Sequence, residues 1–254
     1  MVTDVITIDK GDLVERAIEL MERYRISHLP VTHESKLVGV LSARDMMDGL
    51  GSSRFERIPA RRIYVSALMS EPPVTAKPDV SVAEAVRTMI DMGIGSLPVL
   101  DAGKLVGIVT ESDIIKLLNP EGGVSEFLRK DHPRIMPNER AVHARAIMLE
   151  RGARILPVVD SGKLIGLVTE MTLAKAFFEV RDRVEATYMD DVARRVIIED
   201  IMIESPPFIR SEADMSSVKE AFLDTGLPAL PVINQDGKVI GVIERRSMLR
   251  LLQS

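Results

Sequence analysis

The tripeptide Leu-Pro-Val occurs four times in this chain, and its surroundings repeat with it. The four prolines are Pro30, Pro98, Pro157 and Pro231. In the first three copies a lysine follows the proline by six positions and a glycine by nine, and in the fourth both come one position later. A register held across four copies establishes an internal repeat, which constrains the fold more than any single motif. The chain of 254 residues is therefore expected to contain four similar units joined by linkers.

The second copy shows most clearly what one unit folds into. Apolar residues recur at three- and four-residue spacing from Val82 to Ile90, which predicts an amphipathic helix that ends near Gly93. An apolar strand follows, then a turn at 101–103, a second strand over 104–110 and a second helix near 112–118. With a leading strand, the order is strand, helix, strand, strand, helix. So small a unit leaves an apolar sheet face exposed, and the units are expected to pair.

Composition excludes several classes of protein and of site. Cysteine and tryptophan are absent, so disulfides, thiolate nucleophiles and cysteine metal sites are excluded and the core must be largely aliphatic. The net charge of −5 argues against an extended nucleic-acid surface. We expect no catalytic residues and no metal site, because no nucleophile, base or metal-ligand pattern emerges. The sequence shows neither a membrane-spanning stretch nor a signal-peptide pattern, which predicts a cytoplasmic protein without membrane contact.

Several segments of the second copy match the signature of a known family, with parallels in the other copies. They are Val74-Thr75, Ala85 to Met89, Leu97-Pro98-Val99 and Lys104 to Asp113. In these segments the chain resembles the cystathionine-β-synthase (CBS) domain family. The four copies are expected at residues 1–59, 60–120, 121–180 and 195–254. Four copies on one chain are similar to the gamma subunit of AMP-activated protein kinase and its stand-alone archaeal relatives.

The resemblance implies a mixed α+β fold of four β-α-β-β-α repeats. Two CBS domains would pack through their sheets into a Bateman module, giving modules at residues 1–120 and 121–254. Two modules would form a flat disk. In the family, the clefts between paired domains typically bind adenine nucleotides, and occasionally S-adenosyl compounds.

Each candidate ribose site in this family pairs a Ser or Thr at the end of the third strand with an Asp three residues later. A carboxylate there can accept hydrogen bonds from two ribose hydroxyls. The first two copies are intact, with Ser42 and Asp45 in one and Thr110 and Asp113 in the other. The third keeps Thr169 but has Thr172 in place of the Asp, and the fourth has Glu244 and Ser247. The best sites are therefore expected in the N-terminal module, although an Asp in this position is also a common helix N-cap.

Further ligand contacts follow from the resemblance. The two residues before Leu-Pro-Val would line the cleft and meet phosphate: Ser27 and His28, Gly95 and Ser96, and Arg154 in the third copy. Pro228 and Ala229 of the fourth copy offer no side-chain donor. Adenine would lie near Thr7 or Thr75 and against Val40 or Ile108. Arg154 with Thr169 would form a weaker site for the same or a different ligand.

The linker 54–62 is basic, with four arginines and one acid. Arg61 or Arg62 could fold over a cleft and contact phosphate, because arginine suits bidentate phosphate binding. The alternative is an ordinary solvated linker.

Two function classes remain open after these steps. The favoured one is a non-catalytic sensor that binds AMP, ADP or ATP as a regulatory ligand and transmits occupancy to an unidentified partner protein. The alternative is a docking protein with vestigial clefts, or a binder of an S-adenosyl compound. A nucleic-acid binder acting through 54–62 is disfavoured by the net charge, and formation of a homodimer is left open.

Overall fold

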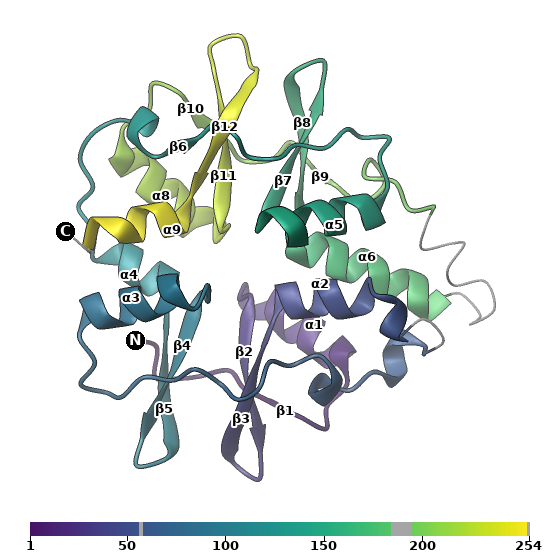
Figure 1. The fold of residues 1–254 in the computed structure, drawn as a ribbon, viewed down its shortest axis with the longest axis vertical. Helices are drawn as coiled ribbons and strands as arrows, with labels where there is room; N and C mark the ends of the chain where they lie inside the picture. Colours follow the sequence, from purple (N-terminus) through teal and green to yellow (C-terminus); the bar gives the residue numbers. More distant parts are fainter. Residues whose placement is uncertain (56–57, 184–194, 253–254) are drawn as a thin grey trace.

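Four similar units surround a common centre in the computed structural model, which describes residues 1–55, 58–183 and 195–252 (Figure 1). The first unit comprises β1 (Ile8–Asp9), α1 (Val14–Tyr24), β2 (His28–His33), β3 (Lys36–Ser42) and α2 (Ala43–Leu50). The second comprises α3 (Val82–Asp91), β4 (Ser96–Asp101), β5 (Lys104–Thr110) and α4 (Glu111–Lys116). The third comprises β6 (Leu128–Arg129), α5 (Ala141–Arg151), β7 (Ile155–Asp160), β8 (Lys163–Thr169) and α6 (Glu170–Arg183). The fourth comprises β9 (Ile203–Glu204), β10 (Ile209–Arg210), α8 (Met215–Thr225), β11 (Ala229–Ile233), β12 (Val239–Glu244) and α9 (Arg245–Leu249). Short 3₁₀ helices lie in the connections: η1 (Ser53–Phe55), η2 (Ala60–Arg62), η3 (Val65–Ala67), η4 (Val124–Glu126) and η5 (Arg250–Leu252).

The predicted order of elements is confirmed. In every unit the Leu-Pro-Val strand pairs antiparallel with the strand that follows it. The leading strand pairs parallel with the Leu-Pro-Val strand, as β1 does with β2. In the second and third units this leading strand is reduced to a single parallel bridge, at Ala76 and at Ile135.

The units pair by exchanging their leading segments. Val2, ahead of the first unit, bridges Ile108 in the second, and Ser70, ahead of the second unit, bridges Val40 in the first. In the other half, β6 pairs with β12 and β9 pairs with β8. Each leading segment therefore extends the sheet of the neighbouring unit, which couples the first unit to the second and the third to the fourth, as the resemblance implies.

The glycine nine or ten residues after each proline is explained by this exchange. A Cβ on Gly39 would lie 2.8 Å from the backbone oxygen of Ser70, and a Cβ on Gly241 would lie 2.6 Å from that of Arg129. These separations are too short for real Cβ contacts, so the exchanged segment can approach the strand only over a glycine.

Helices join the two halves. One cluster of buried apolar side chains runs through the first and third units, where α2 packs against α6. A second runs through the second and fourth units, where α4 packs against α8 and α9 (Figure 1). Arg181 of α6 reaches across the first of these contacts and donates to the backbone oxygen of Ser52, just beyond α2, at 2.7 Å. No helix in the described ranges is long and apolar enough to cross a membrane.

Candidate functional site

Two clefts open in the N-terminal half, between the first and second units. The first cleft has a volume of about 360 Å³ and is lined by Asp45, by the apolar side chains of Val40 and Val74, and by arginines. The second cleft, of about 260 Å³, is lined in the same way by an aspartate, Asp113, by the apolar side chain of Ile108 and by arginines. Both are concave and combine an apolar wall with a few charged groups, which is typical of small-molecule sites.

The carboxylate of Asp45 is held in place by the turn from β3 into α2. Its Oδ2 accepts from the backbone N–H of Ser42 at 2.8 Å and from the Ser42 hydroxyl at 2.5 Å. Its Oδ1 accepts from the hydroxyl of Ser70 at 3.0 Å, a residue of the exchanged segment. Asp45 thus closes a capping box at the start of α2 and also lines the first cleft, so the two interpretations of this residue are compatible.

Asp113 has the equivalent arrangement at the start of α4. Its Oδ2 accepts from the backbone N–H and the hydroxyl of Thr110 at 3.0 and 2.9 Å. Lys116 Nζ lies 3.8 Å from its Oδ1. The side chain of Asp113 is only 13% exposed, and its hydrogen bonds to Thr110 fix its orientation.

The structure places Thr7 and Thr75 differently from the prediction. Both side chains are exposed, and neither residue is among those lining the two clefts. Ile6 and Val74, the residues before them, line the second and first clefts instead. Side chains alternate between opposite sides of an extended segment, so the apolar neighbour faces inward when the threonine faces solvent.

The other predicted contacts of the N-terminal half lie in the clefts. Ser27, His28 and Gly95 line both clefts, and Ser96 lines the first. The backbone of Gly95 is closely approached by both side chains, because a Cβ there would lie 3.0 Å from the His28 ring and 3.2 Å from the Arg154 guanidinium. The two clefts therefore meet at this point, near the centre of the molecule.

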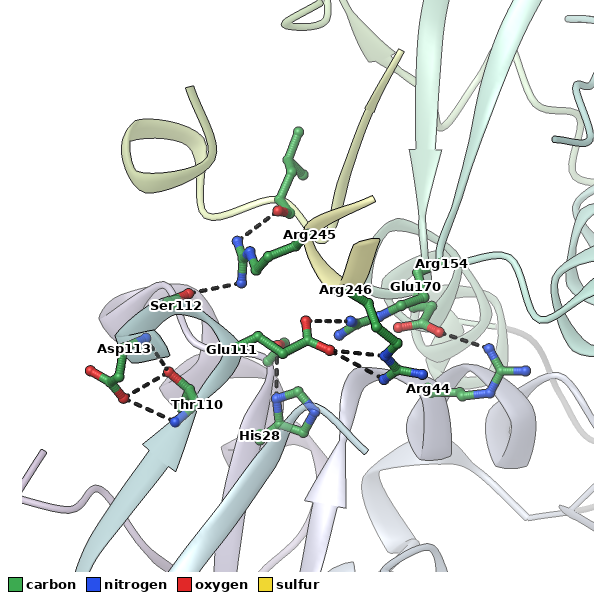
Figure 2. Close-up of polar contacts among 12 residues, drawn as sticks. His28, Arg44, Thr110, Glu111, Ser112, Asp113, Arg154, Glu170, Arg245 and Arg246 are labelled. Atoms are coloured by element: carbon green, nitrogen blue, oxygen red, sulfur yellow. Dashed lines mark hydrogen bonds and ion pairs between the residues drawn. The ribbon is translucent and has the colours of Figure 1, made fainter. Parts of the chain in front are cut away.

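Charged side chains from all four units gather around this meeting point (Figure 2). We define the central cluster as Arg44, Glu111, Arg154, Glu170, Arg245 and Arg246. Glu111 accepts from Arg154 at 2.8 Å and from Arg246 at 3.2 Å. Arg44 donates to Glu170 at 3.0 Å. Because most members begin the last helix of their unit, the first turns of those helices face one another across the molecule.

The central cluster affects the charge of its own members and of the neighbouring His28. Burial and the nearby Arg154 lower the pKa of His28 to about 4, so His28 is neutral near pH 7. Burial alone would raise the pKa of Glu111, but Arg154 and Arg246 outweigh it and hold that pKa below its usual range. Burial lowers the pKa of Arg245 to about 10, and Arg245 bonds to the Ser112 hydroxyl rather than to a carboxylate. The cluster therefore has more arginines than carboxylates, and its glutamates balance part of the arginine charge.

A third cleft, of about 400 Å³, contains Arg154 and Thr169, the predicted weaker site. Arg25 and Arg245 also line it. Thr172 occupies the position of the aspartate, and its hydroxyl lies 2.8 Å from that of Thr169. Arg154 lines all three clefts, so any phosphate groups bound in them would converge on one guanidinium.

The corresponding position of the fourth unit is taken by an internal ion pair. Glu244, where the other units have Ser or Thr, accepts from Arg129 at 2.8 Å. Arg129 belongs to β6 and pairs with Val242 of β12. It therefore occupies the position that Ser70, which pairs with Val40, has in the first unit. His132 is buried beside the same pair, with Nε2 4.0 Å from Glu244. In the fourth unit, therefore, the side chain at the strand end is engaged by Arg129 rather than by a capping aspartate.

Arg61 and Arg62 line none of these three clefts. Both are exposed, and Arg61 Nε lies 3.2 Å from Asp182 of α6, away from the cleft linings. The linker instead runs along the outer end of the contact between α2 and α6, as its short helix η2 packs on α6. Residues 56 and 57 of this linker lie outside the described residues. Apart from Arg25, which lines the second and third clefts, the arginines that line the three clefts belong to the central cluster.

Sequence reasoning missed most of the central cluster. Arg44, Glu111, Glu170, Arg245 and Arg246 occupy the two positions between the strand-end residue and the aspartate or its counterpart. Charged residues at these two positions in all four copies were the available signal. No described group of three or more His, Asp or Glu side chains could hold a metal ion.

Comparison with known proteins identifies the family. The profile for the CBS domain matches residues 1–52, 65–120, 124–179 and 198–254. The chain belongs to the CBS domain family. Uncharacterized protein MJ1225 of Methanocaldococcus jannaschii is 23% identical over 97% of this chain and 94% of its own length. An uncharacterized 33.4 kDa protein of Thermofilum pendens, from a ribosomal RNA operon, is 30% identical over 91% of this chain and 82% of its own length.

Solved structures show the same fold over the whole chain. The crystal structure of MJ1225, described as a proposed archaeal homologue of g-AMPK, has a TM-score of 0.83 at 22% identity and covers 98% of this chain and 96% of its own. An uncharacterized conserved protein from Pyrococcus horikoshii has a TM-score of 0.60 at 23% identity with the same coverage. These two structures therefore share the overall fold of this chain.

Proposed function

We propose that this CBS-domain protein is a non-catalytic sensor that binds adenine nucleotides in the first and second clefts and transmits their occupancy to a partner protein. One observation carries the proposal. Each of these clefts holds a preoriented aspartate, an apolar wall and arginines from the C-terminal half. These three features match the ribose, the base and the phosphate of a nucleotide.

The carboxylates are suited to ribose. A capping box fixes each aspartate through one oxygen, so the side chain is oriented without a ligand. In the first cleft the Ser70 hydroxyl that contacts Oδ1 can be exchanged for a ribose hydroxyl. Charge-assisted bonds of this kind contribute about 1.5 to 3 kcal/mol each, which supports micromolar to millimolar binding.

The arginines favour phosphate over an S-adenosyl group. Arg44, Arg154 and Arg246 line the first cleft, and Arg154 and Arg245 line the second. A sulfonium compound brings a positive charge that these side chains would repel, whereas phosphate provides the planar bidentate contact that arginine prefers. Since Arg154, Arg245 and Arg246 belong to the other module, phosphate binding also provides a route for occupancy to reach the whole molecule.

Calorimetric titration with AMP, ADP, ATP and S-adenosylmethionine tests the proposal. We expect a nucleotide to bind with a dissociation constant below about a millimolar, and Asp45→Ala and Asp113→Ala each to weaken one site by about tenfold or more. Thr172→Ala, at the equivalent position of the third unit and outside the linings of both clefts, is the matched control and should leave both sites unchanged. Failure of every adenosine compound to bind, or full affinity in both aspartate variants, would refute the proposal.

The alternative is a docking protein whose clefts are vestigial, and the ion pair in the fourth unit favours it for that unit alone. A thermal-shift screen separates the two functions. A ligand at 100 times its dissociation constant adds about 2.7 kcal/mol of apparent stability. A screen without any shift, together with a stable protein partner, would support docking.

A further inference from the structure

Glu111 is a carboxylate whose role in the proposed site is unassigned. Its side chain is 1% exposed, and it is the first residue of α4. The position does not require a carboxylate in every copy: buried Ala43 occupies it in the first unit and Arg245 in the fourth, whereas the third unit has the buried Glu170, which is paired with Arg44. A buried charge that the fold does not require needs a separate explanation.

The contacts of Glu111 point to that explanation. One oxygen accepts from Arg154 of the third unit at 2.8 Å, and the other accepts from Arg246 of the fourth at 3.2 Å (Figure 2). Both arginines also line the first cleft, and Arg154 lines the second. Glu111 therefore already occupies part of the guanidinium surface that a ligand phosphate in these clefts would use.

We propose that Glu111 is an internal counter-anion that competes with ligand phosphate for Arg154 and Arg246, and so limits how much phosphate charge the clefts accept. This inference rests on the proposed function, since it assigns a specificity determinant to the same site. The same two guanidinium groups hold Glu111 in its ionised form, so its negative charge is present throughout the neutral pH range.

The electrostatic consequence depends on the ligand. A carboxylate and a phosphate bound to one guanidinium repel each other, and the repulsion grows with every negative charge on the ligand. Adenosine would feel no such repulsion, a monophosphate some, and a triphosphate most. Glu111 should therefore narrow the gain in affinity that additional phosphates would otherwise bring.

The test is calorimetry of Glu111→Gln with adenosine, AMP and ATP. The glutamine keeps the shape of the side chain and one acceptor but removes the charge. We expect adenosine affinity to stay within about twofold, AMP affinity to rise about threefold and ATP affinity to rise about tenfold or more. The control Glu220→Gln, on the exposed face of α8, removes the same charge at a distance and should change none of them. An equal change for adenosine and ATP, or no change for ATP, would overturn the proposal.

Two measurements keep the inference separate from folding and from the proposed function. If Glu111→Gln does not fold, the wild-type protein is titrated at low and high NaCl. If Glu111 offsets the arginine charge, the affinities for AMP and for ATP should fall with salt concentration to about the same extent. A much steeper fall for ATP would contradict the proposal. If no adenosine compound binds the wild-type protein, the proposed function fails. The role of Glu111 is then tested by thermal shift with inorganic tripolyphosphate. A larger shift for Glu111→Gln than for wild type still supports that role, and equal shifts reject it.

Discussion

His28 lies where the two clefts meet, and this position determines the protonation state of its side chain. Its Nδ1 lies 3.0 Å from the Ser27 hydroxyl, and Arg154, Arg245 and Arg246 all act to lower its pKa after burial itself. A neutral imidazole can exchange hydrogen bonds with a ligand without adding positive charge. Under the proposed function, His28 would offer phosphate a polar contact that does not strengthen the repulsion among the arginines.

This position predicts a pH dependence of stability. The pKa of His28 is about 4 in the folded chain and near 6.5 when unfolded, so between these values the unfolded chain binds the extra proton. The free energy of unfolding should therefore fall as pH drops from 6.5 toward 4, with about 2 to 3 kcal/mol contributed by His28. Urea unfolding of wild type and His28→Gln at pH 7 and pH 4.5 measures the contribution.

The comparison needs a histidine control because carboxylates also titrate in this range. His33, whose side chain is 43% exposed, serves this purpose as His33→Gln. Its loss of stability on acidification should equal that of wild type. His28→Gln should lose less, and an unchanged loss would show that burial of His28 does not set the dependence.

Element-scale organisation depends on the exchanged leading segments. Each runs over a glycine of the neighbouring strand, and the segment that crosses Gly39 also delivers the Ser70 hydroxyl to Asp45. A single backbone contact therefore supports both sheet pairing and the geometry of the first cleft.

Gly39→Ala tests this coupling. The new Cβ would meet the Ser70 backbone oxygen at 2.8 Å, so the segment must move away from β3. We expect a loss of about 1 to 3 kcal/mol in the free energy of unfolding, and weaker nucleotide binding in the first cleft than in the second. Gly123→Ala, whose Cβ would have its nearest contact at 3.9 Å, is the control and should be nearly neutral. Denaturant unfolding and calorimetry give both readouts.

The sequence predicted the elements well because their signals are local. The helix 82–91, the strand 104–110 and the position of Asp113 beside Thr110 all follow from residues close together in the chain. The central cluster could not be derived this way, since Glu111 and Arg154 are 43 residues apart and Arg44 and Glu170 are 126 apart. Thr7 and Thr75 were misplaced because the direction of a side chain depends on the pairing register, which the leading segment alone does not fix.

At the scale of the whole molecule, the apolar cores cross the boundary between the two halves. The first core joins the first and third units, and the second joins the second and fourth. Sheet exchange holds the two units of each half together, and helix packing joins one half to the other. Neither half can therefore bury its helices without the other.

The fragment 1–120 should show this dependence. Without the C-terminal half, α2 and α4 lose their partners α6, α8 and α9, and the apolar faces are exposed. We expect the fragment to self-associate or to bind a hydrophobic dye, as measured by light scattering during size-exclusion chromatography and by dye fluorescence. A monodisperse monomer with the thermal stability of the full chain would contradict the prediction.

The ion pair between Arg129 and Glu244 has a consequence for how such repeats diverge. Arg129 reaches Glu244 from an exchanged segment, so the fourth unit, which lacks the capping aspartate, still pairs its strand β12 with the segment of the neighbouring unit. In an exchanged segment the backbone atoms pair with the neighbouring sheet, whereas the side chains make other contacts, with the cleft residue Asp45 for Ser70 and with Glu244 for Arg129. A duplicated unit can therefore lose the residues of a binding site and still be needed for the assembly of the four units. The number of units sets only an upper limit on the number of ligands to which the molecule can respond.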